Sequence, residues 1–264
     1  MNFDTVFSAL PERQADFGPC FAFSVHKCGS SLMHSMINSV CKKADIPAIS
    51  VPDLLFNEGF LEVDWQSDPS LLPAFERRLL YFGFRNLPSI LRAPEFHLRK
   101  RRFVLLVRDP RDALVSQYFS LGKKTGSHAR PKKNADNFNK MLESSGNQEL
   151  DDYVLRAAPN LCNKLKLYRE HLDFDLGLLR RYEDIFFDKE TFLSEIFDHF
   201  GVEVPAGIIA EVAQKHDIRP EREDQTKHIR KGIPGDHAEK LAPETIAQLN
   251  DIFREVGAFY DYRL

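Results

Sequence analysis

Residues 23–36, FSVHKCGSSLMHSM, join two different apolar patterns through a short polar turn. Before the turn, Cys20 to Val25 is a short apolar run preceded by Gly18-Pro19, which predicts a buried strand. After the turn, Leu32 opens a helical spacing of apolar residues that continues to Lys42-Lys43. A strand that enters a helix through a glycine-containing turn is typical of α/β folds, and it aims several backbone N–H groups at one point.

The turn itself carries the groups that bind an anion. Gly29 lets the backbone approach a ligand closely, and the hydroxyls of Ser30 and Ser31 can donate hydrogen bonds. Lys27 adds a positive charge on the same side, so we predict a site for a phosphate or a similar oxyanion. The pattern is not GxxxxGK[ST], because Lys27 precedes the only glycine. The alternative is an ordinary helix start with serine caps.

Further strands and helices alternate along the chain. Phe103 to Val107, FVLLV, is continuously apolar, which indicates a strand buried on both faces, as in a parallel sheet. Asp109-Pro110 predicts a helix start, since aspartate suits the N-cap and proline the first turn. The expected fold is therefore α/β, a parallel sheet flanked by helices in three α/β/α layers, with ligands at the carboxyl ends of the strands. Other predicted strands cover 46–51 and 176–179, and other predicted helices cover 153–171, 192–200, 205–214 and 243–257.

Composition limits the class of protein. A chain of 264 residues, 43% of them hydrophobic, suits a single domain over 1–264, and a net charge of -3 argues against a nucleic-acid binder. No apolar run is long enough to cross a membrane, and the N-terminus lacks a secretion-signal pattern. Four cysteines without a CxxC pair indicate reduced thiols in a cytoplasmic protein. The segment 52–94 is apolar but poorly periodic, and we expect a helical insertion or lid there.

Two later stretches add cations and a hydroxyl. Arg108 follows the FVLLV strand directly and Ser116 lies two helical turns further, so both reach one sheet edge, where a second phosphate can bind. The alternative is an Arg108–Asp112 ion pair, with Ser116 as a small packing residue. HIRKGIPGD, residues 228–236, is a compact cationic loop that contains Arg230, Lys231 and Gly232. Taken alone, this loop is typical of a solvated surface.

Together these stretches resemble the sulfotransferases that depend on PAPS, 3'-phosphoadenosine 5'-phosphosulfate. HKCGSSL is similar to the PKSGTTW-type segment that binds the 5'-phosphosulfate in that family, and RDPRDALVS is similar to its 3'-phosphate segment. RKGIPGDH is similar to the RKGxxGDW segment that closes over the same phosphate, with His237 in place of tryptophan. Tyr182 of the YED triplet matches the family's tyrosine near the adenine. The similarity extends from about Phe21 to Phe253, although Ala242 replaces the usual capping threonine.

The resemblance implies a P-loop-like sulfotransferase domain in which 217–240 is the loop that closes over the cofactor. It implies transfer of a sulfuryl group from PAPS to an acceptor hydroxyl or amine, with release of PAP, 3'-phosphoadenosine 5'-phosphate. Lys27 would stabilise the charge that grows on the oxygen between sulfur and phosphorus, and no metal is expected. The implied cofactor-binding residues are Lys27, Cys28, Gly29, Ser30, Ser31, Leu32, Arg108, Ser116, Tyr182, Arg230, Lys231 and Gly232.

The acceptor and two other functions stay open. A small molecule, a lipid or a carbohydrate fits as acceptor, and the 22 phenylalanines favour an apolar one. One alternative function is a P-loop nucleotide phosphotransferase, a kinase, which would bind magnesium and ATP. The other is a PAP-binding module without catalytic activity.

The residue that takes the acceptor's proton departs from the family pattern. Asn86 stands in RNLP where cytosolic members carry the histidine of a THLP-like segment, and an amide is not a useful base. Asp53 follows the strand predicted at 46–51, and carbohydrate-modifying relatives use a carboxylate, so Asp53 is the first candidate. His26 is another candidate, although it also suits a role in shaping the turn. Glu58 is a weaker candidate than Asp53, and His97 better suits a plain surface position. The predicted catalytic residues are therefore Lys27, Asp53 and His26.

Overall fold

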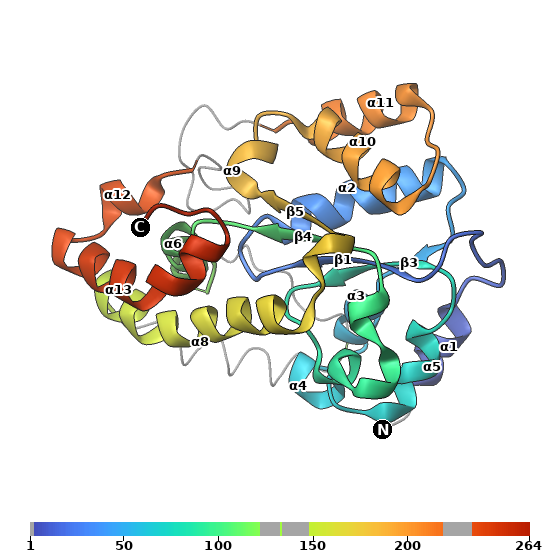
Figure 1. Ribbon diagram of the computed structural model, residues 1–264, viewed down its shortest axis with the longest axis horizontal. Helices are drawn as coiled ribbons and strands as arrows, with labels where there is room; N and C mark the ends of the chain where they lie inside the picture. Colours follow the sequence, from blue (N-terminus) through green and yellow to red (C-terminus); the bar gives the residue numbers. More distant parts are fainter. Residues whose placement is uncertain (1–2, 122–132, 134–147, 219–233) are drawn as a thin grey trace.

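Five parallel strands form one sheet in the computed structural model, which describes residues 3–121, 133, 148–218 and 234–264 (Figure 1). Their order is β2-β3-β1-β4-β5, and each neighbouring pair runs parallel. The carboxyl ends of the strands therefore meet at one edge of the sheet. The strands are β1 (Cys20–Ser24), β2 (Ala48–Ile49), β3 (Leu80–Phe84), β4 (Phe103–Val107) and β5 (Gly177–Arg181).

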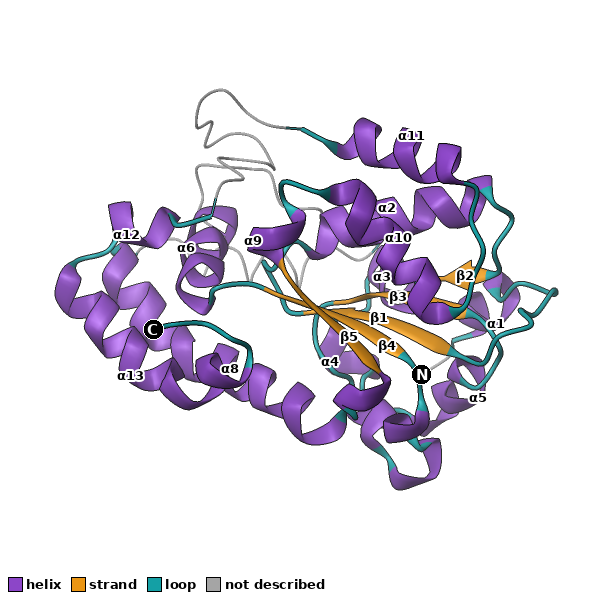
Figure 2. Cartoon of the chain, turned by 45° about the horizontal axis from the view of Figure 1, so that its top comes forward, coloured by secondary structure: helices purple, strands orange, loops and turns teal. Residues whose placement is uncertain are grey.

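Helices cover both faces of this sheet (Figures 1 and 2). One face packs against α2 (Ser30–Lys43), α10 (Lys189–Phe200) and α11 (Ala206–His216). The other face packs against α6 (Pro110–Leu121), α8 (Leu150–His171) and α13 (Pro243–Phe259). The predicted three-layer α/β/α fold is confirmed. None of the helices within the described ranges is long and apolar enough to cross a lipid bilayer.

The pattern of β1 explains how one strand serves two cores. Ala22 joins the cluster on the α2 side, whereas Phe21 and Phe23 join the cluster on the α8 side. All five residues of β1 and all five of β4 are buried. Because both faces of these strands are covered, their sequences are continuous apolar runs rather than alternating ones.

Most predicted elements are confirmed with small changes at their ends. The strand predicted at 176–179 is β5, and the four later predicted helices are α8, α10, α11 and α13. Gly201 ends α10 with a left-handed φ of 72°, as expected of a C-cap glycine. The strand predicted at 46–51 shortens to β2 because α3 (Val51–Asn57) begins directly after it, capped by the side chain of Ser50.

The expectation of a helical insertion or lid over 52–94 is wrong for residues 80–84. These residues form β3, which lies between β2 and β1 in the sheet. A short apolar run has no period that separates a strand from a buried helix, and Gly83 interrupts it. A Cβ on Gly83 would lie 2.0 Å from Oγ of Ser50, so glycine here makes room for the start of α3. The helical parts of the segment are α3, α4 (Glu62–Trp65), α5 (Leu72–Phe75) and short 3-10 turns.

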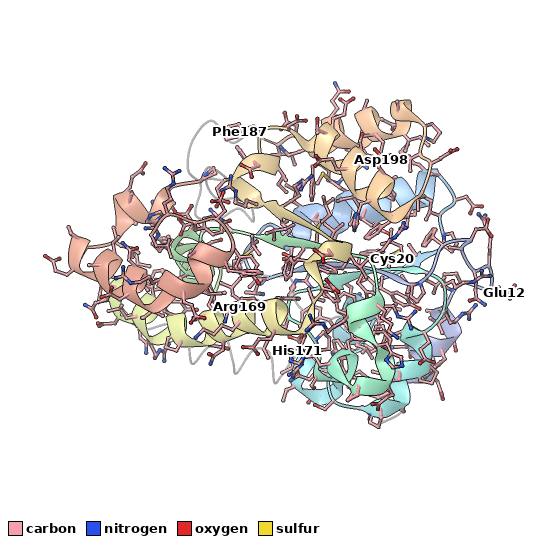
Figure 3. All side chains as sticks on the ribbon, in the orientation of Figure 1. Glu12, Cys20, Arg169, His171, Phe187 and Asp198 are labelled. Atoms are coloured by element: carbon pink, nitrogen blue, oxygen red, sulfur yellow. The ribbon has the colours of Figure 1, made fainter. Side chains whose placement is uncertain are left out.

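All four cysteines are free thiols with buried side chains. Cys20, labelled in Figure 3, is the first residue of β1. Burial raises the pKa of the Cys20 thiol and of the Cys41 thiol to about 12, so both stay protonated and unreactive at neutral pH. All four cysteines pack as small core residues.

Candidate active site at the carboxyl edge of the sheet

The turn after β1 has the local geometry that its sequence predicts. Lys27 and Gly29 both have left-handed backbone conformations, with φ of 67° and 87°. Gly29 is the N-cap residue of α2. The backbone amides of residues 30–32, in the first turn of this helix, therefore have no carbonyl acceptor within the helix. They point out of the helix end at the carboxyl edge of the sheet, where the helix dipole also favours an anion.

Tyr182 packs directly against this turn. It is the first residue of α9 (Tyr182–Ile185), immediately after β5. A Cβ on Gly29 would lie 2.5 Å from Cδ2 of the Tyr182 ring, closer than real Cβ contacts come. Glycine is thus required at position 29 both by the ring and by the positive φ. The predicted adenine-side tyrosine therefore lies beside the predicted phosphate site.

Arg108 lies between the turn and α6. Its guanidinium carbon is 4.6 Å from the centroid of the Tyr182 ring, and Nη1 donates to the carbonyl of Lys27 at 3.5 Å. Nη2 is 3.6 Å from Oδ2 of Asp112, so the ion pair considered from the sequence is also present. Nε is buried and has no hydrogen-bond partner among the described residues. A buried guanidinium with an unsatisfied N–H suits a phosphate oxygen. Ser116 is partly buried on the same helix.

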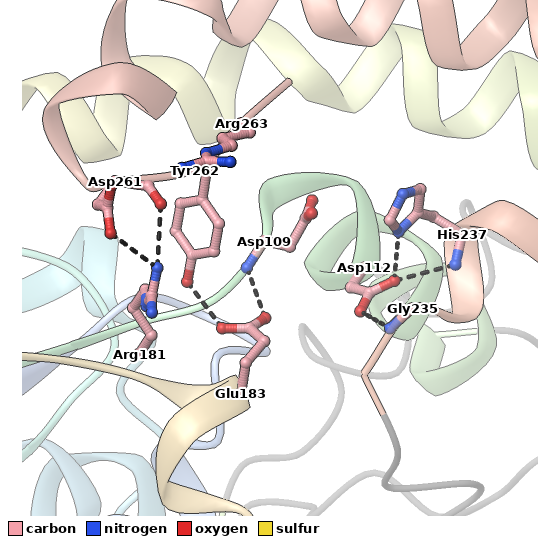
Figure 4. Close-up of a pocket in the computed structure, with 9 residues that line it drawn as sticks. All are labelled: Asp109, Asp112, Arg181, Glu183, Gly235, His237, Asp261, Tyr262 and Arg263. Atoms are coloured by element: carbon pink, nitrogen blue, oxygen red, sulfur yellow. Dashed lines mark hydrogen bonds and ion pairs between the residues drawn. The ribbon is translucent and has the colours of Figure 1, made fainter.

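Asp112 anchors the described end of the loop predicted to close over the cofactor (Figure 4). Its carboxylate accepts from the backbone N–H of Gly235 at 2.6 Å. It also accepts from the backbone N–H of His237 at 2.9 Å and from Nδ1 of the same residue at 2.7 Å. Contacts thus connect Lys27 to Arg108, Arg108 to Asp112, and Asp112 to Gly235. The predicted cofactor-binding residues Arg230, Lys231 and Gly232 lie outside the described residues.

Asp112→Asn is expected to destabilise the protein in a pH-dependent way. Burial raises the pKa of the Asp112 carboxyl, but hydrogen bonds from His237 and Gly235 and the charge of Arg108 outweigh burial and lower the pKa from 3.8 to about 2. The carboxylate therefore contributes about 2 kcal/mol of stability at neutral pH, which is lost as the pH falls through its folded pKa. Urea unfolding at pH 7 should show this loss, and the difference between variant and wild type should shrink below roughly pH 4. A difference that is the same at every pH would contradict this assignment.

A cavity of about 480 Å³ shares Asp112, Gly235 and His237 with this anchor (Figure 4). Inside it, the carboxylate of Glu183 accepts from the backbone N–H of Asp109 at 2.9 Å and from the hydroxyl of Tyr262 at 2.9 Å. Burial raises the pKa of Glu183. The many carboxylates that line this cavity argue against an anion there. Among the described residues, no group of three His, Cys, Asp or Glu side chains is placed to hold a metal ion. The lining residues are Asp109, Asp112, Arg181, Glu183, Gly235, His237, Asp261, Tyr262 and Arg263.

Asp53, the first candidate base, lies at the start of α3. Oγ of Ser50 donates to Oδ2 of Asp53 at 2.7 Å, and Nη1 of Arg85 donates to Oδ1 at 3.1 Å. The Asp53 side chain is 39% exposed. These contacts tie the start of α3 to the residue that follows β3, so both carboxylate oxygens have a structural role.

The other candidate bases are spread over the molecule. His26 is partly buried in the turn, directly before Lys27. Glu58 forms an ion pair with Lys133, at 2.6 Å between Oε2 and Nζ. His97 is exposed in the segment that leads into the amino end of β4, and its φ is 52°. Of these three candidates, the fold thus places only His26 in the turn itself.

Sequence reasoning missed a charged cluster beside Asn86. The amide Nδ2 of Asn86 donates to Oε2 of Glu62 in α4. Lys164 of α8 interacts electrostatically with the same carboxylate, and Arg85 contributes a second positive charge. These residues lie far apart in the sequence, and their spacing carries no motif. Only the packing of α4 and α8 near the end of β3 brings them together.

A family model described as a sulfotransferase domain matches residues 19–259. This chain belongs to the sulfotransferase family. The match includes the turn after β1, Arg108 and the loop predicted to close over the cofactor, and the predicted resemblance to the sulfotransferases is confirmed. No curated protein matches the sequence of this sulfotransferase.

Solved structures agree with the fold of this sulfotransferase. Mouse sulfotransferase SULT7A1, complexed with PAP, is 15% identical, with 97% of this chain and 90% of that chain covered and a TM-score of 0.60. Sulfotransferase STF9 from Mycobacterium avium is 12% identical, with 99% and 80% covered and a TM-score of 0.53. Retinol dehydratase in complex with androsterone and PAP is 16% identical, with 97% and 84% covered and a TM-score of 0.50.

The protein is an enzyme that transfers a sulfuryl group from PAPS and releases PAP. The predicted donor and the predicted reaction type are confirmed. The family assignment therefore favours neither a nucleotide kinase nor a PAP-binding module without activity.

Proposed function

We propose that this sulfotransferase binds PAPS along the carboxyl ends of β1, β4 and β5. The 5'-phosphosulfate lies on the turn, where the backbone from Cys28 to Leu32 and the hydroxyls of Ser30 and Ser31 surround it. The 3'-phosphate contacts Arg108 and Ser116. Tyr182 lies beside the adenine, and the site is completed by Arg230, Lys231 and Gly232.

One contact carries this proposal. Nη1 of Arg108 reaches the carbonyl of Lys27, which supports two cationic sites within the span of one nucleotide. Asp112 contacts both Arg108 and Gly235. These two contacts support the proposal that the loop ending at Gly235 lies over the 3'-phosphate bound by Arg108.

Lys27 is proposed to stabilise the leaving group. As the acceptor bonds to sulfur, the bond from sulfur to the 5'-phosphate oxygen breaks and negative charge grows on that oxygen. An ammonium group next to this oxygen stabilises the transition state more than the ground state, which raises the rate of transfer. A sulfuryl group carries less charge than a phosphoryl group, so a lysine suffices for this role. Asp53 and His26 stay predictions for the group that takes the acceptor's proton.

We propose a small-molecule alcohol or amine as the acceptor. Retinol dehydratase, which shares the fold, is solved with androsterone, and this supports a small molecule rather than a polymer. At least nine phenylalanines are fully buried in the described core, so phenylalanine content gives little support to an apolar acceptor. The charged cluster of Arg85, Glu62 and Lys164 beside β3 favours an acceptor with polar groups near its reacting atom.

We also propose that the enzyme works in the cytoplasm. Its four cysteines are free thiols, and each is buried in the core. Proteins of oxidising compartments commonly convert such residues to disulfides, so free thiols support a reducing compartment.

PAP is expected to bind at least about 100-fold more tightly than AMP, because AMP lacks the phosphate that Arg108 contacts. Isothermal titration calorimetry with PAP, AMP and magnesium-ATP measures this preference. Equal affinities for PAP and AMP would contradict the proposed site. Tighter binding of magnesium-ATP than of PAP would instead favour a kinase.

A further inference from the structure

The order of the strands assigns one side of the site to the acceptor. The proposed PAPS site occupies the ends of β1, β4 and β5, which leaves the ends of β3 and β2 on the other side of the turn. In-line transfer requires the acceptor to approach sulfur opposite the leaving oxygen. With the nucleotide on the β4 side of the turn, this approach comes from the β3 side.

Asn86 lies on that acceptor side. Phe84, the last residue of β3, pairs with Phe23 of β1. Asn86 and Val25 each lie two residues beyond this pair, and Val25 directly precedes the turn. Because neighbouring strands are about 4.8 Å apart, Asn86 lies next to the turn that carries Lys27.

Glu62 is held in place by Asn86. The amide Nδ2 of Asn86 donates to Oε2 of Glu62, while Oε1 accepts from no residue in the described part of the chain. The short helix α4 that carries Glu62 is itself fixed, since the backbone N–H of Leu61 donates to Oδ2 of Asp64 at 2.7 Å and Trp65 is buried. Glu62 is partly rather than fully buried.

Ionisable groups from two elements, α8 and the end of β3, lie near this carboxylate. Lys164 and Tyr168 face it from α8, and Arg85 faces it from the end of β3. Burial raises the pKa of Glu62, and this effect exceeds the opposing effects of Asn86, Lys164 and Arg85. A carboxylate that binds its proton more tightly than in water is a better base near neutral pH. Lys164 also interacts with Cys28, so the turn and Glu62 lie within electrostatic range of one ammonium group.

We propose that Glu62 is the catalytic base of this sulfotransferase and that Asn86 is its positioning residue, an inference that rests on the proposed PAPS site. Oε1 of Glu62 takes the proton of the acceptor hydroxyl while the acceptor oxygen forms its bond to sulfur. The bond between sulfur and the 5'-phosphate oxygen breaks, and its electron pair stays on PAP, where Lys27 stabilises the charge. Glu62 then gives the proton to water.

Asp53 is less suited to this role than Glu62. Its Oδ1 accepts from Arg85 and its Oδ2 accepts from Ser50, so proton transfer to Asp53 would disturb the contacts that hold α3 against β3. Glu62 keeps one carboxylate oxygen available and is bound to the residue that replaces the family's histidine. Asn86 thus lies where the family's histidine is expected, and its amide holds the Glu62 carboxylate at that position.

Glu62→Gln tests this inference, because glutamine has the same shape but cannot accept a proton. Labelled PAPS is incubated with a panel of neutral alcohols, phenols and amines, and with water alone, while release of PAP is followed. We expect transfer to the best acceptor to fall by about 100-fold or more, with PAP affinity unchanged within threefold.

Wild-type kcat/KM should rise with pH through one ionisation that is absent from the variant, because Glu62 must be ionised to accept the proton. Carbon-13 NMR of labelled glutamate should show the same ionisation, above the usual range, in the free enzyme.

Two comparison variants make the outcomes distinct. Glu95→Gln removes an exposed carboxylate outside the site and should keep the wild-type rate and pH profile. Asp53→Asn should keep the ionisation in its pH profile. Unchanged transfer in Glu62→Gln, or loss of the ionisation only in Asp53→Asn, would overturn the inference. A glutamate resonance with an ordinary titration would do the same. Failure of the wild type to bind PAP would instead overturn the proposed PAPS site.

Discussion

Lys27→Ala is expected to slow sulfuryl transfer by about 10³-fold while PAP affinity changes by less than about tenfold. The reason is that the ammonium group acts on charge that appears only as the bond to sulfur breaks. In the proposed site, PAP binding depends mainly on the backbone amides of residues 30–32 and on Arg108, which the substitution leaves in place. Single-turnover release of PAP from PAPS gives the rate, and calorimetry with PAP gives the affinity.

The left-handed backbone at Lys27 requires a control for this experiment. A φ of 67° is unfavourable for any residue with a side chain, so alanine brings no new backbone strain there. Lys42→Ala removes an exposed lysine at the other end of α2 and should keep both rate and affinity. If Lys27→Ala lost PAP affinity and rate in equal proportion, Lys27 would bind the ground state and the proposed role in the transition state would be wrong.

The sheet could be predicted from the sequence wherever burial on both faces dictates the residue type. FVLLV in β4 and the run in β1 are continuously apolar because every side chain of these strands is buried, and the flanking turn residues and short length of each run favoured a strand. The ends of α10 and α6 could also be placed, since Gly201 and Asp109 act through local backbone conformation and capping. Each of these signals depends on residues within a few positions of the element itself.

β3 could not be predicted in the same way. Its sequence, LYFGF, contains a glycine with a φ of 95° that weakens a strand pattern. The glycine is there because Ser50 and Asp53 of another element approach that backbone closely. Tertiary packing therefore chose a residue that local propensity argues against, and the surrounding short helices obscured the strand further.

The candidate site also contains residues that local sequence identifies and residues that only tertiary packing identifies. Lys27, Gly29 and Arg108 could be proposed from the sequence because groups that bind a phosphate lie in fixed places next to strand ends. Glu62 could not, because its role depends on an amide contact from Asn86 and on the approach of α8. A group that takes a proton can come from any element that reaches the acceptor, so its position in the sequence is not fixed by the sheet.

Arg108→Ala is expected to remove most of the preference for PAP over AMP. A charge-assisted contact to phosphate is worth about 1.5–3 kcal/mol, and a guanidinium forms more than one such bond, so PAP affinity should fall by about 100-fold or more. AMP affinity should change much less, since AMP has no 3'-phosphate. The ratio of the two dissociation constants, measured by calorimetry on the same preparation, cancels any general loss of folded protein.

Two further arginine variants separate charge from geometry at this position. Arg108→Lys keeps the charge but loses the planar group that lies over the Tyr182 ring, so its preference for PAP should fall between wild type and alanine. Arg111→Ala removes a neighbouring guanidinium that binds Asp109 and Asn250, and the preference for PAP should persist in it. If Arg108→Ala kept the preference, the 3'-phosphate would have to be bound elsewhere. Because Asp112 joins Arg108 to Gly235, that outcome would also remove the reason to place the closing loop over the nucleotide.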